Sequence, residues 1–204
     1  MIRYLPGVIA MAVIVAASNI LVQYQLGNYL TWGALSYPFA FLVTDVTNRI
    51  YGPSAARRVV LVGFVTGVAC SFIAAGLSLT TLRIAIGSGS AFLVAQMLDV
   101  SIFDRLRHAR AWWTAPFVSS LIGSTVDTII FFSIAFSMQL AFINPADDVA
   151  WANEIIPLLG TGPDAPLWMS LAVADWMVKT VLAMLALVPF RILVRKILGR
   201  TPVF

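Results

Sequence analysis

Residues 4–44 read YLPGVIAMAVIVAASNILVQYQLGNYLTWGALSYPFAFLVT and contain no Asp, Glu, Lys or Arg. One crossing of the hydrocarbon core of a bilayer needs about 20 apolar residues, so this stretch is long enough to cross twice. Of the 204 residues of the chain, 60% are hydrophobic and 11% are charged, a balance far from that of a soluble domain. The sequence therefore predicts an all-α integral membrane protein.

Working outward from this stretch, we expect six transmembrane helices, at roughly 5–22, 31–50, 58–79, 82–104, 113–142 and 166–190. The first resembles a secretory signal because Arg3 precedes an apolar run, but the run continues to Val22 and the next helix follows almost at once. We therefore interpret it as a retained helix. We expect residues 1–204 to form one transmembrane domain, in which 143–165 is a solvated connector.

Basic residues predict the orientation, because they gather on the cytoplasmic side of membrane proteins. They follow the second, fourth and sixth expected helices: Arg49, Arg57, Arg58, Arg105, Arg107, Arg110, Arg191, Arg195, Lys196 and Arg200. The connection 143–165 carries four acidic residues and no Lys or Arg. We therefore expect both termini to be cytoplasmic. We also expect the net charge of +4 to serve contact with anionic lipid rather than with nucleic acid.

The sequence offers no basis for a cofactor. Cys70 is the single cysteine and His108 the single histidine, so neither a disulfide nor a zinc site is expected. No Gly-x-x-x-x-Gly-Lys-Ser/Thr pattern occurs, so the chain has no phosphate-binding loop of its own.

Three aspartates interrupt apolar segments: Asp45, Asp99 and Asp127. An Asp at the centre of a spanning helix costs about 2.5–3.5 kcal/mol, so a group of them indicates a polar site within the bilayer. A weak repeat relates residues 96–103 to 124–131, and in each copy a polar residue, Gln96 or Ser124, lies three positions before the Asp on the same helical face. Both faces are expected to meet one ligand. Helix packing is the alternative explanation, but it accounts for two charged residues less well than for serine and glycine.

Two acid–base pairs have the spacing of one helical turn. Asp175 and Lys179 are expected either to neutralise each other or to leave Lys179 for Asp99, Asp127 or a substrate oxygen. For Asp45 and Arg49 an intrahelical ion pair is the simplest explanation.

Two further residues of the second helix bear on the site. Asn48, three residues after Asp45, offers both hydrogen-bond donors and acceptors, as recognition of a nucleobase edge requires. Pro38 is expected to kink or interrupt this helix.

These residues resemble the signature of the queuosine precursor transporter family, a vitamin-uptake-transporter-like family. The resemblance covers nearly the whole chain. Its segments are Tyr37-Pro38, Phe41 to Val46 with Asn48, Tyr51-Gly52, Ala56-Arg57-Arg58, Ser90-Ala91-Phe92 with Gln96 and Asp99, Ile102-Phe103, Leu106-Arg107, Ser119-Ser120, Asp127, Phe131 and Lys179. The chain departs from the family at Thr114-Ala115-Pro116, where an Arg-Asn pair is expected, and at Ser124, where Gln is usual.

The resemblance implies a bacterial inner-membrane importer, not an enzyme, that takes up 7-cyano-7-deazaguanine and 7-aminomethyl-7-deazaguanine for queuosine salvage into modified tRNA. On this interpretation Asp99 and Asp127 bind the base edge, Asp45 and Asn48 close the site, and Lys179 balances the charge. A carboxylate accepts two adjacent N–H groups of a guanine-like edge, while Gln96, Asn48 or Lys179 donates to its carbonyl. Stacking is assigned to Phe92, Phe103 and Trp176.

Other functions remain open at this stage. A substrate-binding subunit of an energy-coupling-factor vitamin importer is also a small six-helix protein, but it would require cytoplasmic ATPases. An intramembrane aspartyl enzyme would use Asp99 and Asp127 to activate water, although no Gly-x-Gly-Asp motif surrounds either. A non-catalytic assembly factor would tolerate Asn at these positions. The sequence also leaves open proton coupling versus facilitated diffusion, and a monomer versus a homodimer.

Overall fold

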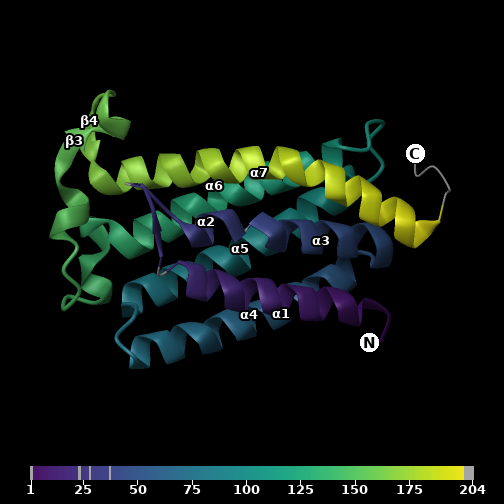
Figure 1. The fold of residues 1–204 in the computed structure, drawn as a ribbon, viewed down its shortest axis with the longest axis horizontal. Coiled ribbons are helices and arrows are strands. Elements are labelled where there is room, and N and C mark those ends of the chain that lie inside the picture. Colours follow the sequence, from purple (N-terminus) through teal and green to yellow (C-terminus); the bar gives the residue numbers. More distant parts are fainter. Residues whose placement is uncertain (1, 23, 28, 37, 200–204) are drawn as a thin grey trace.

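The computed structural model describes residues 2–22, 24–27, 29–36 and 38–199. Helices dominate it (Figure 1). Their bounds are α1 (Leu5–Leu21), α2 (Trp32–Ser36), α3 (Pro38–Tyr51), α4 (Pro53–Gly76), α5 (Leu82–Leu106), α6 (Thr114–Phe136) and α7 (Leu167–Leu198). Two short antiparallel hairpins lie in connections, formed by β1 (Gln25–Leu26) with β2 (Leu30–Thr31) and by β3 (Ile155–Pro157) with β4 (Asp164–Pro166). The connection predicted as solvated thus holds a hairpin and short 3₁₀ turns.

The surface of the bundle is suited to lipid. Helices α4, α5, α6 and α7 are long and apolar enough to cross a membrane, and α1 is a shorter apolar helix. Large apolar side chains point outward: Phe72 is 71% exposed and Val65 is 65% exposed. The interior instead holds charged groups such as Asp99 and Arg83, which have no exposed surface. Because intramembrane ionisable residues face the bundle interior, this arrangement is that of a helical, multi-pass membrane protein.

Three predicted helix boundaries differ from the structure by five residues or more. α4 begins at Pro53 rather than at 58, because proline is well tolerated in the first turn of a helix. α6 ends at Phe136 rather than at 142, because Ser137 takes an extended backbone (φ −65°, ψ 131°) and a 3₁₀ helix, Met138–Ile143, follows. α7 continues to Leu198, past the expected end at 190, because its last turn carries Arg195 and Lys196, which suit a helix C-terminus.

The expected interruption of the second helix at Pro38 is confirmed, since α2 ends at Ser36 and α3 begins at Pro38. Tyr37, part of the family signature, lies outside the described residues. The interruption redirects the chain into the middle of the bundle, where α3 contacts α1, α4, α5, α6 and α7. Half of the residues of α3 are buried, among them the polar residues Asp45 and Asn48, while Phe39 stays 47% exposed.

Close packing holds α1, α4 and α5 together around an apolar core of Met11, Val59, Val60, Phe92 and neighbours. Gly63 on α4 permits this approach: a Cβ atom there would lie 2.6 Å from Cγ of Met11 and 2.9 Å from Cζ of Phe92. Any side chain at this position would therefore force the helices apart.

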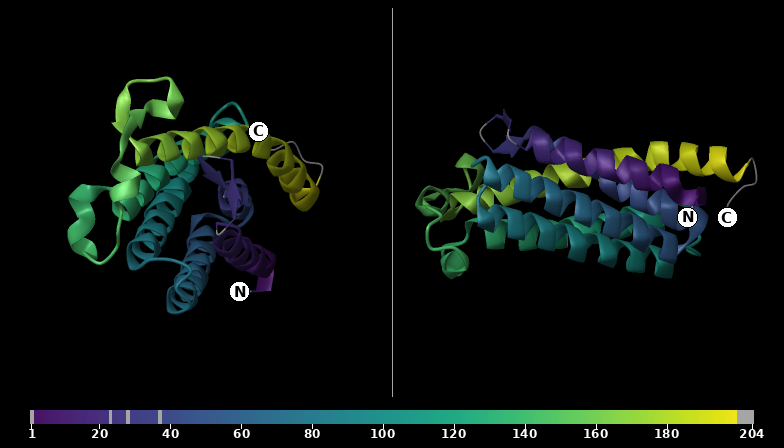
Figure 2. Two further views of the ribbon diagram at one scale, coloured as in Figure 1. Left: turned by 60° about the vertical axis from the view of Figure 1, so that its left-hand side comes forward. Right: turned by 90° about the horizontal axis from the view of Figure 1, so that it is seen from below.

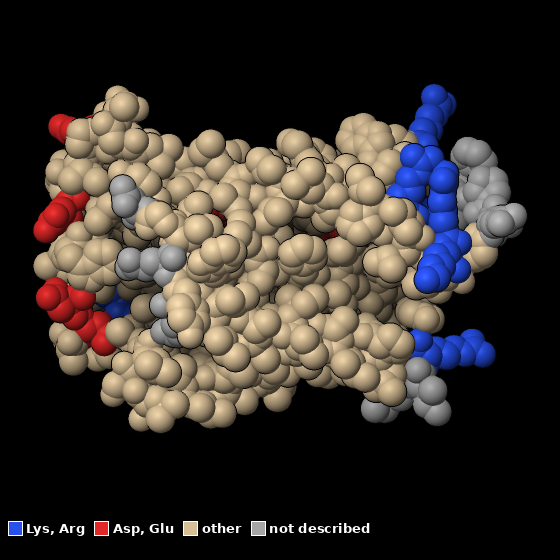
Figure 3. Space-filling view, viewed as in Figure 1, with Lys and Arg blue, Asp and Glu red and all other residues tan. Residues whose placement is uncertain are grey.

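Charged residues are divided between the two ends of the bundle. Acidic residues gather over the end that carries β3 and β4, and basic residues gather at the opposite end (Figure 3). α1 begins and α7 ends at the basic end, as two further views confirm (Figure 2). The described chain thus starts and finishes on the same side of the bundle. Arg200, one of the predicted orienting residues, lies outside the described residues.

Candidate functional site

A cavity of about 380 Å³ extends from the acidic end into the interior of the bundle. Tyr29, Thr80 and Trp151 line it near the connections at the acidic end, and Asp127 and Lys179 line it in the interior. The volume falls within the range of about 300–1,000 Å³ that is usual for small-molecule sites. The cavity is therefore large enough for a small organic ligand.

Aromatic rings form part of the cavity wall. Phe131, Phe132 and Phe136 of α6 and Trp151 line it. The rings of Phe131 and Phe132 meet edge to face with centroids 5.0 Å apart, and those of Phe136 and Trp151 do so at 5.7 Å. Such a wall can pack against a flat heteroaromatic ligand. Sequence analysis singled out only Phe131; the repeated Phe spacing along α6 was the signal for the others.

The interior end of the cavity carries three charged side chains, Asp127, Asp175 and Lys179, which we call the floor triad. Nζ of Lys179 lies 2.7 Å from Oδ2 of Asp127 and 2.5 Å from Oδ2 of Asp175. Thr128 donates to Asp175 at 3.0 Å. Of the alternatives left open for Lys179, the structure therefore shows pairing with Asp175 and Asp127 together, and no ion pair with Asp99.

A second group of polar residues lies deeper, between α3, α5 and α6, and we call it the inner polar cluster. Its members are Thr44, Asp45, Asn48, Gln96, Asp99, Ser119 and Ser120, all of them buried. The Thr44 hydroxyl donates to Oε1 of Gln96 at 2.7 Å, and the Asn48 amide donates to the Val100 carbonyl at 3.0 Å. These two hydrogen bonds join α3 to α5 through polar side chains that lie within otherwise apolar helices.

Several buried atoms of the inner polar cluster have no hydrogen-bond partner in the described part of the chain. They are both carboxylate oxygens of Asp99, Nε2 of Gln96 and Oδ1 of Asn48. Gln96 and Asp99 are one helical turn apart on α5 and have no exposed surface. Because an unpaired buried polar group is costly, unmet donors and acceptors at one place point to a ligand that completes them.

Asp45 lies beside Asp99 in this cluster. Its carboxylate accepts hydrogen bonds from Ser119 at 3.3 Å and from Ser120 at 3.2 Å. The expected intrahelical ion pair with Arg49 is wrong, because Arg49 donates instead to the Arg107 carbonyl at 2.6 Å. The Arg49 side chain thus binds the backbone just after the end of α5, whereas the Asp45 side chain points toward α6.

The cluster and the cavity are separate in this conformation. Gly123 of α6 lies against α5, where a Cβ atom would be 3.4 Å from Cβ of Asp99. Asp127 is four residues further along α6, about 6 Å nearer the acidic end. Asp127 lines the large cavity and Asp99 does not, so the two repeated faces do not meet at one surface. The void beside Asp45 measures about 10 Å³, the space of a single water molecule.

The aromatic residues assigned to stacking lie elsewhere. Phe92 belongs to the apolar core with Met11, and Phe103 meets Phe190 edge to face at 6.1 Å. Trp176 is 37% exposed on the side of α7, where its indole N–H donates to Thr125 at 2.9 Å. None of the three lines the large cavity. A single sequence does not reveal which way each ring turns, because that depends on helix rotation.

Similar proteins identify the family. Residues 31–194 match the family described as "Putative vitamin uptake transporter". Over 209 residues the chain is 33% identical to the "Queuosine precursor transporter" of Escherichia coli (strain K12), an alignment that covers 92% of this chain and 84% of the relative. The chain belongs to the queuosine precursor transporter family. The resemblance found in the sequence is thereby confirmed, and membership in the family makes the protein a membrane transporter.

Two other relatives in the queuosine precursor transporter family carry the name "Probable queuosine precursor transporter". That of Haemophilus influenzae is 39% identical over 153 residues, covering 60% of this chain and 65% of the relative. That of Bacillus subtilis (strain 168) is 32% identical over 152 residues, covering 64% of each. No solved structure matches the chain.

Proposed function

We propose that this protein imports the queuosine precursors 7-cyano-7-deazaguanine and 7-aminomethyl-7-deazaguanine across the bacterial inner membrane. The names of three relatives support the substrate class. The observation that carries the proposal is the pair of unpartnered groups on α5, the Asp99 carboxylate and the Gln96 amide N–H, which are buried together.

These two groups complement a guanine-like edge. The edge presents two adjacent N–H donors and one carbonyl, and a carboxylate accepts both donors while an amide N–H donates to the carbonyl. The unpartnered Oδ1 of Asn48 accepts the second proton of the exocyclic amine. Asp45 closes the cluster from α3, and the floor triad with Asp127 and Lys179 holds the charge balance above it. The substrate-binding set thus spans both polar groups.

The charge division supports an orientation with the basic end in the cytoplasm, because basic residues accumulate on that side. The cavity then opens outward, away from the cytoplasm. α1, the interrupted α2–α3 segment and the four long helices make six crossings, with both termini inside. Cargo enters the cavity, passes the floor triad and occupies the inner polar cluster. A rearrangement of helices then exposes the cluster to the cytoplasm.

Uptake by cells that cannot make queuosine precursors tests this function. Labelled 7-cyano-7-deazaguanine and 7-aminomethyl-7-deazaguanine are supplied to cells with and without the gene, and to cells carrying Asp99→Asn. Hydrogen bonds to a charged group are worth about 1.5–3 kcal/mol, so Asp99→Asn should reduce uptake by roughly tenfold or more. The amide also keeps the size of the side chain.

Asp104→Asn is the matched control, because it makes the same change on the same helix, outside the cluster, where Asp104 pairs with Arg107. It should transport normally. Membrane levels of each variant are measured by immunoblot. Uptake by Asp99→Asn equal to wild type at equal membrane levels would contradict the role of Asp99, and no gene-dependent uptake would contradict the function itself. Vesicles with imposed or collapsed proton gradients decide the energy source, since identical rates exclude proton coupling.

A further inference from the structure

A separate cavity of about 260 Å³ lies at the basic end, between the end of α3, the connection 107–113 and the last turns of α7. Five arginines line it: Arg49, Arg107, Arg110, Arg191 and Arg195. No Asp or Glu is among the described residues that line it. This cavity shares no lining residue with the large cavity or with the floor triad. Binding of cargo in the large cavity therefore does not explain why this second cavity is rich in arginine.

Several of these guanidinium groups are held in place. Arg49 donates to the Arg107 carbonyl at 2.6 Å, and Arg107 donates in return to the Asn48 carbonyl at 2.9 Å. The Arg191 guanidinium lies 4.7 Å from the centre of the Trp112 ring, at cation–π distance. Side chains that are already ordered lose little entropy when a ligand binds. The cavity is therefore preorganised around its positive charges.

The positive charge of the cavity is largely uncompensated. Within the described chain, Arg107 has one carboxylate partner, Asp104 at 3.0 Å, and the other four arginines form no ion pair. Like charges in a shared cavity repel one another, and a bound anion removes that repulsion. The planar guanidinium fork matches the oxygens of phosphate and carboxylate groups.

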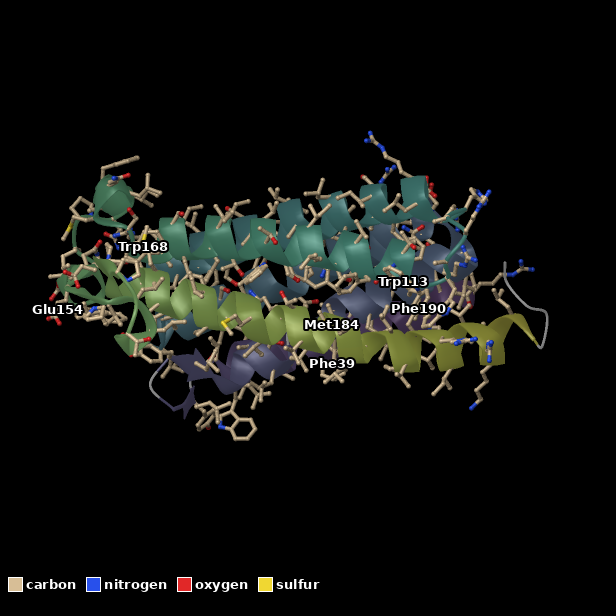
Figure 4. All side chains as sticks on the ribbon, turned by 90° about the horizontal axis from the view of Figure 1, so that it is seen from above. Phe39, Trp113, Glu154, Trp168, Met184 and Phe190 are labelled. Carbon is tan, nitrogen blue, oxygen red and sulfur yellow. The ribbon has the colours of Figure 1, made fainter. Side chains whose placement is uncertain are left out.

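The remaining walls are apolar. Phe103, Leu106, Phe190 and Val194 line the side of the cavity that faces the bundle. Phe190 lies on α7 toward the basic end (Figure 4). A ligand that fits both parts has an anionic head and an apolar tail. Basic pockets between helices at the cytoplasmic side bind lipid headgroups in this way.

We propose that this cavity is a binding site for the phosphate headgroup of an anionic phospholipid, with the apolar walls receiving the start of an acyl chain. The ordinary gathering of basic residues on the cytoplasmic side is the competing explanation. The two explanations make different predictions. A specific binding site requires the arginines that line the cavity, whereas binding by diffuse surface charge depends only on the number of basic residues at this end. Arg57 and Arg105 are exposed basic-end residues outside the cavity and supply the comparison.

The test uses the full protein in nanodiscs of phosphatidylcholine that contain a small fraction of phosphatidylglycerol. Lipid that stays bound after extraction is measured by native mass spectrometry. One variant carries Arg110→Gln with Arg195→Gln, both exposed and without a carboxylate partner in the described protein, and the control carries Arg57→Gln with Arg105→Gln. The cavity variant loses two charge-assisted contacts to the bound phosphate, so it should bind phosphatidylglycerol about tenfold or more weakly. Arg57 and Arg105 do not line the cavity, so the control should bind as wild type.

Equal weakening in both variants would overturn the proposal in favour of diffuse surface charge. Inorganic phosphate provides the second arm. If phosphate alone displaces phosphatidylglycerol at equal concentration, the site recognises free phosphate and the lipid assignment is wrong. Displacement only by lipids with both an anionic head and acyl chains supports it. These measurements need no transport activity, so their outcome is independent of the proposed cargo.

Discussion

Nζ of Lys179 on α7 lies 2.7 Å from Oδ2 of Asp127 on α6, and the two side chains are 5% and 4% exposed. The same ammonium group also pairs with Asp175, one turn earlier on its own helix. One cation therefore pairs with carboxylates from two helices at the interior end of the cavity. The floor triad ties α6 to α7 at the level where the cavity ends.

Lys179→Met should destabilise the protein. It leaves two buried carboxylates without a cation, and breaking a buried ion pair by removing one partner costs about 3–5 kcal/mol. The measurement is the melting temperature of the detergent-solubilised protein. Lys196→Met, an exposed change on the same helix, is the control and should have little effect. Adding Asp127→Asn and Asp175→Asn to Lys179→Met should recover most of the loss, and a failure to recover any would show that charge is not its cause.

Ser88→Phe should block the cavity. Ser88 lines it on α5, and a phenyl ring there would occupy space meant for the ligand. Because the ring would clash with a ligand in the cavity, uptake of the labelled precursor should fall by roughly tenfold. Val94→Phe adds a ring to the same helix at a side chain that is 47% exposed, and it should transport normally. Equal uptake by both variants would show that cargo does not use this cavity.

Gly63→Val should loosen the packing of α1 against α4. The added atoms meet Met11 and Phe92, with the first of them 2.6 Å from Met11 Cγ, and the free energy of unfolding should fall by roughly 1–3 kcal/mol. Gly76→Val is the matched control on the same helix, because nothing lies within 4 Å of a Cβ atom there. Denaturant titration compares the two. If the two variants are equally stable, the packing of Met11 and Phe92 against Gly63 does not restrict the size of the residue at this position.

Arg83→Lys should weaken the acidic end. Arg83 has no exposed surface and donates from Nε to the Ile134 carbonyl at 3.0 Å and from Nη2 to the Ser137 carbonyl at 2.7 Å. A lysine lacks the fork that reaches two carbonyls, and a buried acceptor left unpaired costs about 1–3 kcal/mol. Limited proteolysis of the 138–166 segment should become faster in this variant and stay unchanged in Arg105→Lys.

Much of the site was predictable as a list of residues, because a charged group in an apolar helix stands out by its cost. Asp45, Asp99, Asp127 and Lys179 were named on that ground, and all four are buried. Their partners were not predictable. Whether Arg49 turns to Asp45 or to the end of α5 depends on how α3 packs in three dimensions. The same holds for Trp176, which faces outward.

Helix existence and the break at Pro38 followed from local chemistry, since an uncharged run and a proline act within a few residues. The end of α6, however, involves a distant group. Ser137 ends α6, and its carbonyl accepts from Arg83, more than 50 residues earlier in the chain. The structural role of Arg83 was not predicted, because a single basic residue beside a turn belongs to no periodic pattern.

The hydrogen bonds between α3 and α5 have a consequence for how the carrier moves. Thr44 to Gln96, Asn48 to Val100 and the reciprocal bonds of Arg49 and Arg107 join these helices along their length, so they are bound to travel as one unit. The small void beside Asp45 lies between α3, α6 and α7. Phe190 borders both that void and the arginine-lined cavity. If the protein imports its cargo as proposed, we expect the cargo to leave along this boundary, past the Phe190 ring.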